Sequence, residues 1–166
     1  IQALLNFAYM GGFIIVPQML ETGLGFTSSH IGWLVIARPL TFSITAPLAS
    51  MVTMRIGERR SGVIGAIGII VSMLLLSSVS AGSSDIVIAL GLAMSGVGFG
   101  IAGPALTGLV ANAVDDETVG VAGAMQQLLS QMGAVLGSTV MISIHEMTAG
   151  STTVVRSYGL ALLAGA

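Results

Sequence analysis

The sequence has no cysteine and no lysine, and it has few charged residues of any kind. The absence of cysteine excludes disulfides, zinc–thiolate sites and thiol catalysis within these 166 residues. Charged residues make up only 7% of the chain, whereas a soluble domain has about 25%. A surface so poor in charge must face lipid or other protein rather than water.

The few ionisable residues form no pattern that indicates chemistry. The net charge of -2 gives no reason to expect nucleic acid as a partner. The pair His145-Glu146 is not followed by the second histidine of a metalloprotease motif, and no Ser/His/Asp set is suggested by spacing. We therefore expect no metal site, no cofactor and no enzymatic activity.

Apolar residues and glycine are abundant instead. The chain is 54% hydrophobic, has 23 glycines and has a mean hydropathy of +1.00. A bilayer core needs about 20 apolar residues as helix, and no long stretch alternates as a barrel strand would. We predict an all-α integral membrane protein, a single bundle of six transmembrane helices whose first and last are cut short, in a fragment of a longer protein. The expected helices span about residues 1–20, 29–54, 61–81, 85–113, 118–145 and 154–166.

The arginines predict the orientation of these helices. Three of the five lie in the link RIGERRSG between the second and third helices, which places that link in the cytoplasm. By alternation, the acidic link between the fourth and fifth helices is also cytoplasmic. We expect Arg59 or Arg60 to pair with an acid of that link and latch one conformation. The candidate acids are Asp115, Asp116 and Glu117.

Small residues and prolines predict how the helices pack and bend. The run GFGIAG at 98–103 matches a dinucleotide-binding fingerprint, but no strand precedes it, so close helix packing is the favoured interpretation. Pairs of glycines four residues apart form faces for such packing, and prolines inside a helix bend it. The packing pairs are Gly96 with Gly100 and Gly133 with Gly137, and the expected bends lie at Pro39, Pro47 and Gly103-Pro104.

Arg38 is the only charge well inside a predicted span. An arginine at the centre of a bilayer costs roughly 2.5–3.5 kcal/mol on insertion scales. Two structural interpretations are that it reaches toward the outer headgroups or bonds to a carbonyl that Pro39 leaves free. Two functional interpretations are that it faces a cavity and steers substrate, or pairs with an acid outside these residues. All four remain open at this point.

Two further polar pairs lie inside spans. Gln127 and Gln131 are four residues apart and share a helix face. They serve either as interhelical hydrogen-bonding groups or as the lining of a polar cavity. Asn6 and Tyr9 form a similar pair on the first helix, for which cavity lining is favoured. All seven acids lie at predicted helix ends, so a membrane-embedded proton carrier is expected outside these residues.

The basic link resembles the loop signature G-x-L-a-D-r-x-G-r-r of the major facilitator superfamily. Ser50, Met54 and Glu58 depart from that pattern. The neighbouring stretches are similar, in order and spacing, to the C-terminal bundle of EmrB/QacA-type drug:proton antiporters. The loop residues that match are Arg55, Gly57, Arg59 and Arg60; the other matching positions are Gln18, Gly25, Gly32, Pro47, Ala49, Gly120, Ala122, Gly123, Gln131, Gly133 and Gly137.

This resemblance implies the C-terminal six-helix half of a fourteen-span transporter in a bacterial plasma (inner) membrane. It implies export of lipophilic drugs or metabolites by alternating access, driven by proton entry. The expected partners are the N-terminal helical bundle of the same transporter, the lipid bilayer, a small lipophilic substrate and protons. Three alternatives stay open: a twelve-span relative, an importer of sugars or small organic acids, and a membrane assembly module that does not transport.

Overall fold

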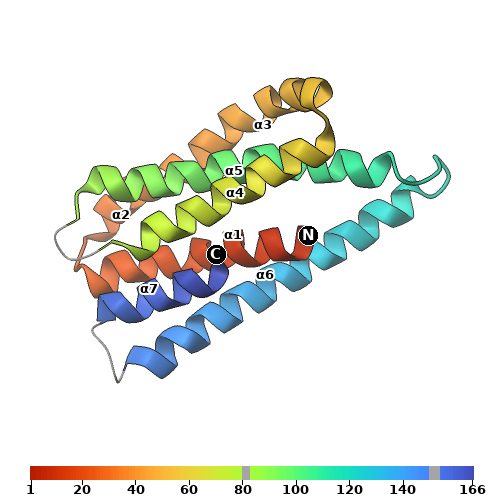
Figure 1. The fold of residues 1–166 in the computed structure, drawn as a ribbon. Coiled ribbons are helices and arrows are strands. Elements are labelled where there is room, and N and C mark those ends of the chain that lie inside the picture. Colours follow the sequence, from red (N-terminus) through yellow and green to blue (C-terminus); the bar gives the residue numbers. More distant parts are fainter. Residues whose placement is uncertain (80–82, 150–153) are drawn as a thin grey trace.

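Seven α-helices and one short π-helix make up the computed structural model, which describes residues 1–79, 83–149 and 154–166 (Figure 1). No strand occurs within these ranges, so the prediction of an all-helical chain is confirmed. The elements are α1 (Gln2–Gln18), η1 (Met19–Gly23), α2 (Ser28–Val35), α3 (Ala37–Ile56), α4 (Glu58–Ser77), α5 (Asp85–Ala111), α6 (Val119–Ala149) and α7 (Val154–Gly165).

Five helical segments of the described chain are long and apolar enough to cross a membrane. They are α1 with η1, α2 with α3, α4, α5 and α6. The sixth predicted segment is also helical, but α7 has 12 residues and falls short of the length that a span requires. The structure therefore supports five spans and one additional short helix.

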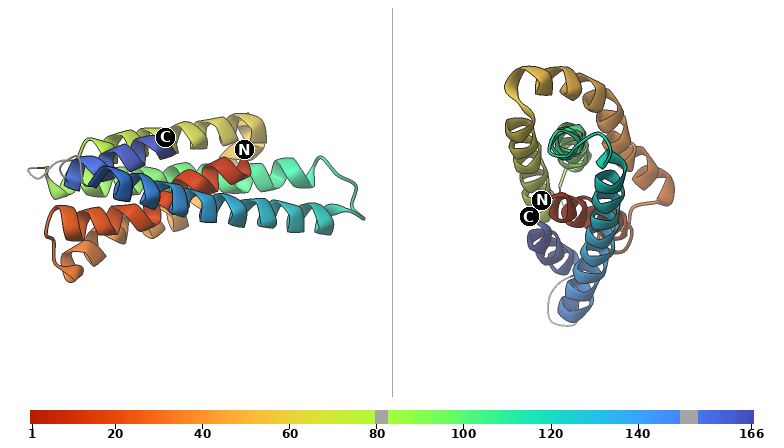
Figure 2. Two further views of the ribbon diagram at one scale, coloured as in Figure 1. Left: turned by 90° about the horizontal axis from the view of Figure 1, so that it is seen from below. Right: turned by 90° about the vertical axis from the view of Figure 1, so that its right-hand side faces the viewer.

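The helices α1 and α5 lie in the middle of the bundle (Figure 2). Both α3 and α4 pack against α5, while α6 packs against α1 and α7 contacts α6, α4 and α1. In the most apolar part of each span, 56% of the residues are buried in α1 and 44% in α5. The corresponding share is 11% in the α2–α3 segment and 17% in α6. These two segments thus expose most of their surface, on either side of the central helices.

Glycine 57 alone connects α3 to α4, where the predicted bounds left a link of six residues, 55–60. Its φ of 90° lies in a region that side chains with a Cβ rarely adopt, so Gly57 can reverse the chain within one residue. Arg55 lies in the last turn of α3, and Arg59 and Arg60 lie in the first turn of α4. The predicted start of the third helix at residue 61 was therefore three residues too late.

The helix is interrupted just before Arg38, at Ile36, which separates α2 from α3 while keeping helical dihedral angles. Pro39 therefore lies in the first turn of α3, where its missing N–H is tolerated. The helix then runs without interruption through Pro47, and α5 likewise continues through Pro104. The bends expected at these prolines stay predictions.

Glycines allow three pairs of helices to approach closely. A Cβ built on Gly96 would collide with the side chain of Thr41 and the carbonyl of Arg38, so this glycine brings α5 against α3. Gly98 lies back to back with Gly65 and brings α5 against α4. On α6, a Cβ at Gly137 would collide with the carbonyl of Phe7. The other predicted packing glycines also make close contacts, Gly100 with Thr45 and Gly133 with Ala3.

Candidate functional site

The side chain of Arg38 is buried between the central helices and is only 1% exposed. Its Nε donates a hydrogen bond to the hydroxyl of Ser95 on α5, at 2.6 Å, and that hydroxyl in turn donates to the carbonyl of Leu92. Neither Nη atom has a hydrogen-bond partner among the described residues. The side chain therefore does not reach toward the headgroups, and Ser95 takes the place of a carbonyl freed by Pro39.

Aromatic rings from three helices surround this guanidinium. Its Cζ lies 4.4 Å from the ring centre of Tyr9 and 5.7 Å from that of Phe13, both on α1. The Tyr9 ring stacks on Phe99 of α5 at 4.1 Å, and Phe42 of α3 packs against Phe99 at 5.9 Å. We call this group, completed by Ser95, the Arg38 cluster. Cation–π contacts of this kind are worth about 2 kcal/mol or more when desolvated.

The cluster contains half of the eight aromatic residues of the chain. Phe13, Phe42 and Phe99 each lie close to the middle of a candidate span, so the cluster sits near half depth in the membrane. Sequence reasoning missed these three residues and Ser95, because they belong to different helices and have no common spacing. Their shared depth within the spans is the signal that would have found them.

The two predicted cavity-lining residues of α1 are buried in the structure. Tyr9 is 9% exposed and lies between Arg38 and Phe99, while Asn6 is 6% exposed and donates to the carbonyl of Gln2 within its own helix. On α6, Gln127 and Gln131 are exposed and form no hydrogen bond within the described chain. They are thus not interhelical hydrogen-bonding groups within this bundle.

The residue that links α6 to α5 is the neighbouring glutamine. The side-chain amide of Gln126 donates to the hydroxyl of Thr107 at 3.2 Å. This is the kind of interhelical bond that the sequence suggested for Gln127 and Gln131. The alternative role of Gln127 and Gln131, as the lining of a polar cavity, stays a prediction.

The predicted latch is not formed. Among the described residues, the only ion pair within 4.0 Å joins His30 and Asp85, so neither Arg59 nor Arg60 pairs with the 115–117 run. The carboxylate of Glu58 instead accepts a hydrogen bond from Asn112 Nδ2 at 2.7 Å. Since Gly57 reverses the chain so tightly, Glu58 rather than the arginines faces the end of α5. We call this the Gly57 end of the bundle.

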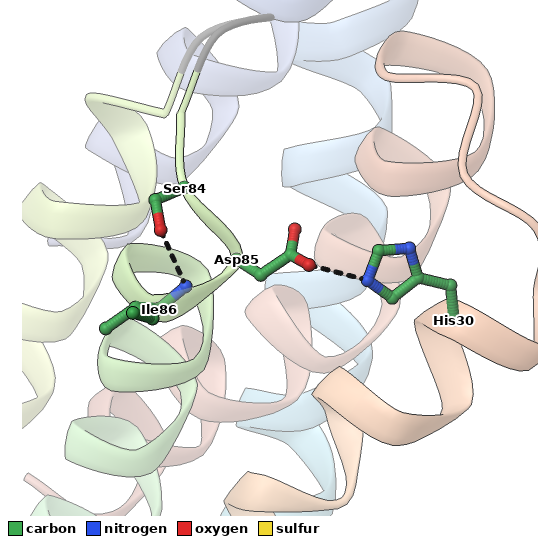
Figure 3. Close-up of polar contacts among 4 residues, drawn as sticks. All are labelled: His30, Ser84, Asp85 and Ile86. Atoms are coloured by element: carbon green, nitrogen blue, oxygen red, sulfur yellow. Dashed lines mark hydrogen bonds and ion pairs between the residues drawn. The ribbon is translucent and has the colours of Figure 1, made fainter.

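A second set of polar contacts lies at the opposite end, which we call the His30 end. His30 Nε2 lies 2.8 Å from Asp85 Oδ2, which joins α2 to the start of α5 (Figure 3). Next to it, Ser84 caps α5 by accepting from the backbone N–H of Ile86 at 3.3 Å (Figure 3). At the start of α2, Thr27 occupies the cap position and makes no side-chain hydrogen bond there.

Histidine 145 also lies at the His30 end, in a more enclosed setting than a solvated interface. Its ring stacks on Tyr158 of α7 at 3.7 Å, and its Nδ1 lies 2.9 Å from the hydroxyl of Ser157. The Tyr158 hydroxyl is 2.7 Å from that of Thr22 in η1. These contacts tie α7 to both α6 and the end of the first span.

The described residues contain no group of three or more His, Cys, Asp or Glu side chains that could hold a metal ion. The Arg38 cluster offers one positive charge, unsatisfied N–H donors and several ring faces. Such a set can bind and orient a ligand, but it contains no nucleophile beside a base.

Comparison with known proteins gives a consistent result. The sequence profile of the Major Facilitator Superfamily matches residues 1–166. The chain is 26% identical to the multidrug resistance protein Stp of Mycobacterium tuberculosis over 138 aligned residues. The aligned region covers 83% of this chain and 26% of that protein. It is 21% identical to the multidrug transporter protein MdtP of Bacillus subtilis over 147 aligned residues. That region covers 89% of this chain and 27% of the relative. The chain thus spans about a quarter of the length of these relatives.

A profile match over all 166 residues agrees with the long apolar helices of the structure. The chain belongs to the Major Facilitator Superfamily, a family of membrane transporters.

Proposed function

We propose that this chain is the C-terminal helical bundle of a proton-coupled transporter of the EmrB/QacA type, which exports lipophilic drugs or metabolites. The observation that carries this proposal is the superfamily match over residues 1–166, together with two relatives named as multidrug proteins. The chain covers about a quarter of each relative, in keeping with one part of a larger helical assembly.

The proposed mechanism is alternating access, in which two bundles rock around a site at the bilayer midplane. The Arg38 cluster lies at that depth and supplies one wall of the site. Gln127 and Gln131 of α6 are exposed and without partners in the described chain, so they are available to substrate or to the rest of the transporter. The exposed surfaces of α2–α3 and α6 are where the N-terminal bundle would pack.

The proposed orientation places the Gly57 end in the cytoplasm of a bacterial cell. Arg55, Arg59 and Arg60 lie at that end, and Arg156 is the only arginine near the other. The proton-carrying group would lie outside these residues, because every acid of this chain lies at or next to a helix end. Proton entry toward the cytoplasm would then drive substrate out of the cell.

Efflux of a neutral lipophilic dye tests this proposal. Cells that express the full-length protein would be loaded with Nile red without an energy source and then given glucose. We expect faster loss of fluorescence than in cells that carry an empty vector, and a protonophore should remove the difference. Equal efflux in the two strains, with the protein shown to be in the membrane, would contradict the proposal.

A further inference from the structure

Arg38 is a buried cation without a counter-ion in its own bundle. The side chain is 1% exposed, and within the described residues the only ion pair is that between His30 and Asp85. All seven acids of the chain lie at or next to the ends of helices, far in sequence from the middle of any span. A buried charge that lacks a partner is strongly unfavourable.

The surrounding rings compensate for the charge only in part. The faces of Tyr9 and Phe13 attract the cation, but a ring face is a poor substitute for an oxygen acceptor. A guanidinium has five N–H donors, and only the one on Nε is used, by Ser95. The four donors on Nη1 and Nη2 match the fork geometry with which arginine holds a carboxylate or phosphate. The missing group is therefore an oxyanion.

The cluster reaches the surface of the bundle at Phe13. This ring is 46% exposed, whereas Tyr9 and Ser95 are buried, so a change in the Phe13 rotamer would open the cluster to the surface. A group that reaches Arg38 by this route passes the Phe13 ring and meets the Tyr9 ring.

We propose that Arg38 binds an oxyanion that the described chain does not supply, and that this oxyanion is the acidic group of a planar aromatic substrate. The inference rests on the proposed transport function and adds that, among lipophilic compounds, aromatic acids are bound in preference to neutral compounds and cations. The positive charge at the cluster disfavours permanent cations. The same oxyanion chemistry is available from an Asp or Glu side chain elsewhere in the transporter, and the experiment separates the two sources.

Two dyes of similar ring system but opposite charge provide the test. Binding of fluorescein, an anion, and tetramethylrhodamine ethyl ester, a cation, would be measured by fluorescence anisotropy on the purified full-length protein. We expect the wild type to prefer fluorescein. In Arg38→Gln, fluorescein binding should weaken about 10-fold or more, the value of a hydrogen bond to a charged group, while binding of the cation should be unchanged or stronger. Arg38→Lys should be intermediate.

Ser78→Ala is the control, because Ser78 lies at the end of α4, is exposed, and its hydroxyl bonds only to the carbonyl of Leu75 in its own helix. It should keep the preference for fluorescein. Arg38→Gln could instead leave the dye preference unchanged and lower the stability of the protein. If neutralising one membrane-embedded Asp or Glu elsewhere then restores that stability, the oxyanion is a protein carboxylate. If neither change occurs, Arg38 binds no oxyanion. Failure of the wild type to bind either dye counts against the proposed drug-binding function. The stability measurements on Arg38→Gln would still test whether Arg38 binds an oxyanion.

Discussion

The guanidinium carbon of Arg38 lies 4.4 Å from the centre of the Tyr9 ring, and its Nε donates to Ser95 at 2.6 Å. A residue of α3 is thereby tied to both central helices, α1 and α5. The contact explains how a charge can be placed near half depth in an apolar bundle: its surroundings supply a ring face and one hydroxyl. It also leaves the Nη atoms unsatisfied, which gives the cluster its proposed binding role.

Removing the Ser95 hydroxyl should destabilise the protein. Ser95→Ala leaves Nε of the buried guanidinium without an acceptor, as Nη1 and Nη2 already are, and a hydrogen bond to a charged group is worth about 1.5–3 kcal/mol. The measurement is the thermal unfolding of the full-length protein in detergent. Ser138→Ala is the control, since Ser138 is exposed on α6 and bonds only to its own helix. Equal unfolding temperatures for the two variants would show that the Arg38–Ser95 bond is not important for stability.

Adding a methyl group at Gly137 should separate α6 from α1. The new Cβ would collide with the carbonyl of Phe7, and overpacking of this kind typically costs about 1–3 kcal/mol. Gly123 lies on the same helix with nothing near its Cβ position, so Gly123→Ala should instead gain roughly 0.5–1 kcal/mol from helix propensity. Thermal unfolding should thus move in opposite directions for the two substitutions. A Gly137→Ala protein as stable as the wild type would contradict the packing described for α1 and α6.

The hydroxyl of Tyr158 should hold α7 in place. Its contact with Thr22 spans 136 positions in sequence and is 2.7 Å long. Tyr158→Phe removes this bond but keeps the ring stacked on His145, and should cost about 0.5–1.5 kcal/mol. Faster amide exchange in α7, measured by mass spectrometry, is the expected result. Tyr9→Phe serves as the control, because the Tyr9 hydroxyl makes no hydrogen bond to the described residues, and unchanged exchange in α7 of both variants would refute the prediction.

The absence of cysteine in this chain makes its sidedness easy to test. Single cysteines would be placed at Thr27 and at Asp116, which are exposed and lie at the His30 end and the Gly57 end, in an otherwise cysteine-free full-length protein. In intact cells, a membrane-impermeant maleimide should label Thr27→Cys and should label Asp116→Cys only after lysis. The reverse pattern would overturn the orientation inferred from the arginines.

Much of the fold could be predicted because its signals are local. Long apolar runs separated by polar links predict helices and their approximate bounds, and glycines four residues apart predict close packing. The one-residue turn at Gly57 could not be predicted from the link, because RIGERRSG contains good helix formers and only the observed φ of 90° shows where the chain reverses. The sequence also could not predict which helix each glycine contacts, since Gly96 and Gly98 lie two residues apart and face different helices.

The candidate site was predicted only in part. Arg38 and Tyr9 stood out as polar groups inside apolar spans, yet nothing in the sequence placed one against the other. Phe13 and Phe99 have no local motif, and they become meaningful only when three helices bring them to the same depth. The pairing of Arg59 or Arg60 with the 115–117 run is not formed in this structure and stays a prediction, because charge complementarity between links does not determine which side chains face each other across a turn.

Coupling of substrate to proton movement tests the central claim most directly. The full-length protein would be reconstituted in liposomes that contain a pH-sensitive dye and are more acidic inside than outside. Addition of an exported substrate should make the internal pH rise faster than the passive leak, in proportion to the amount of active protein. A rate of pH change that is the same with and without substrate, in liposomes shown to contain folded protein, would contradict proton-coupled transport.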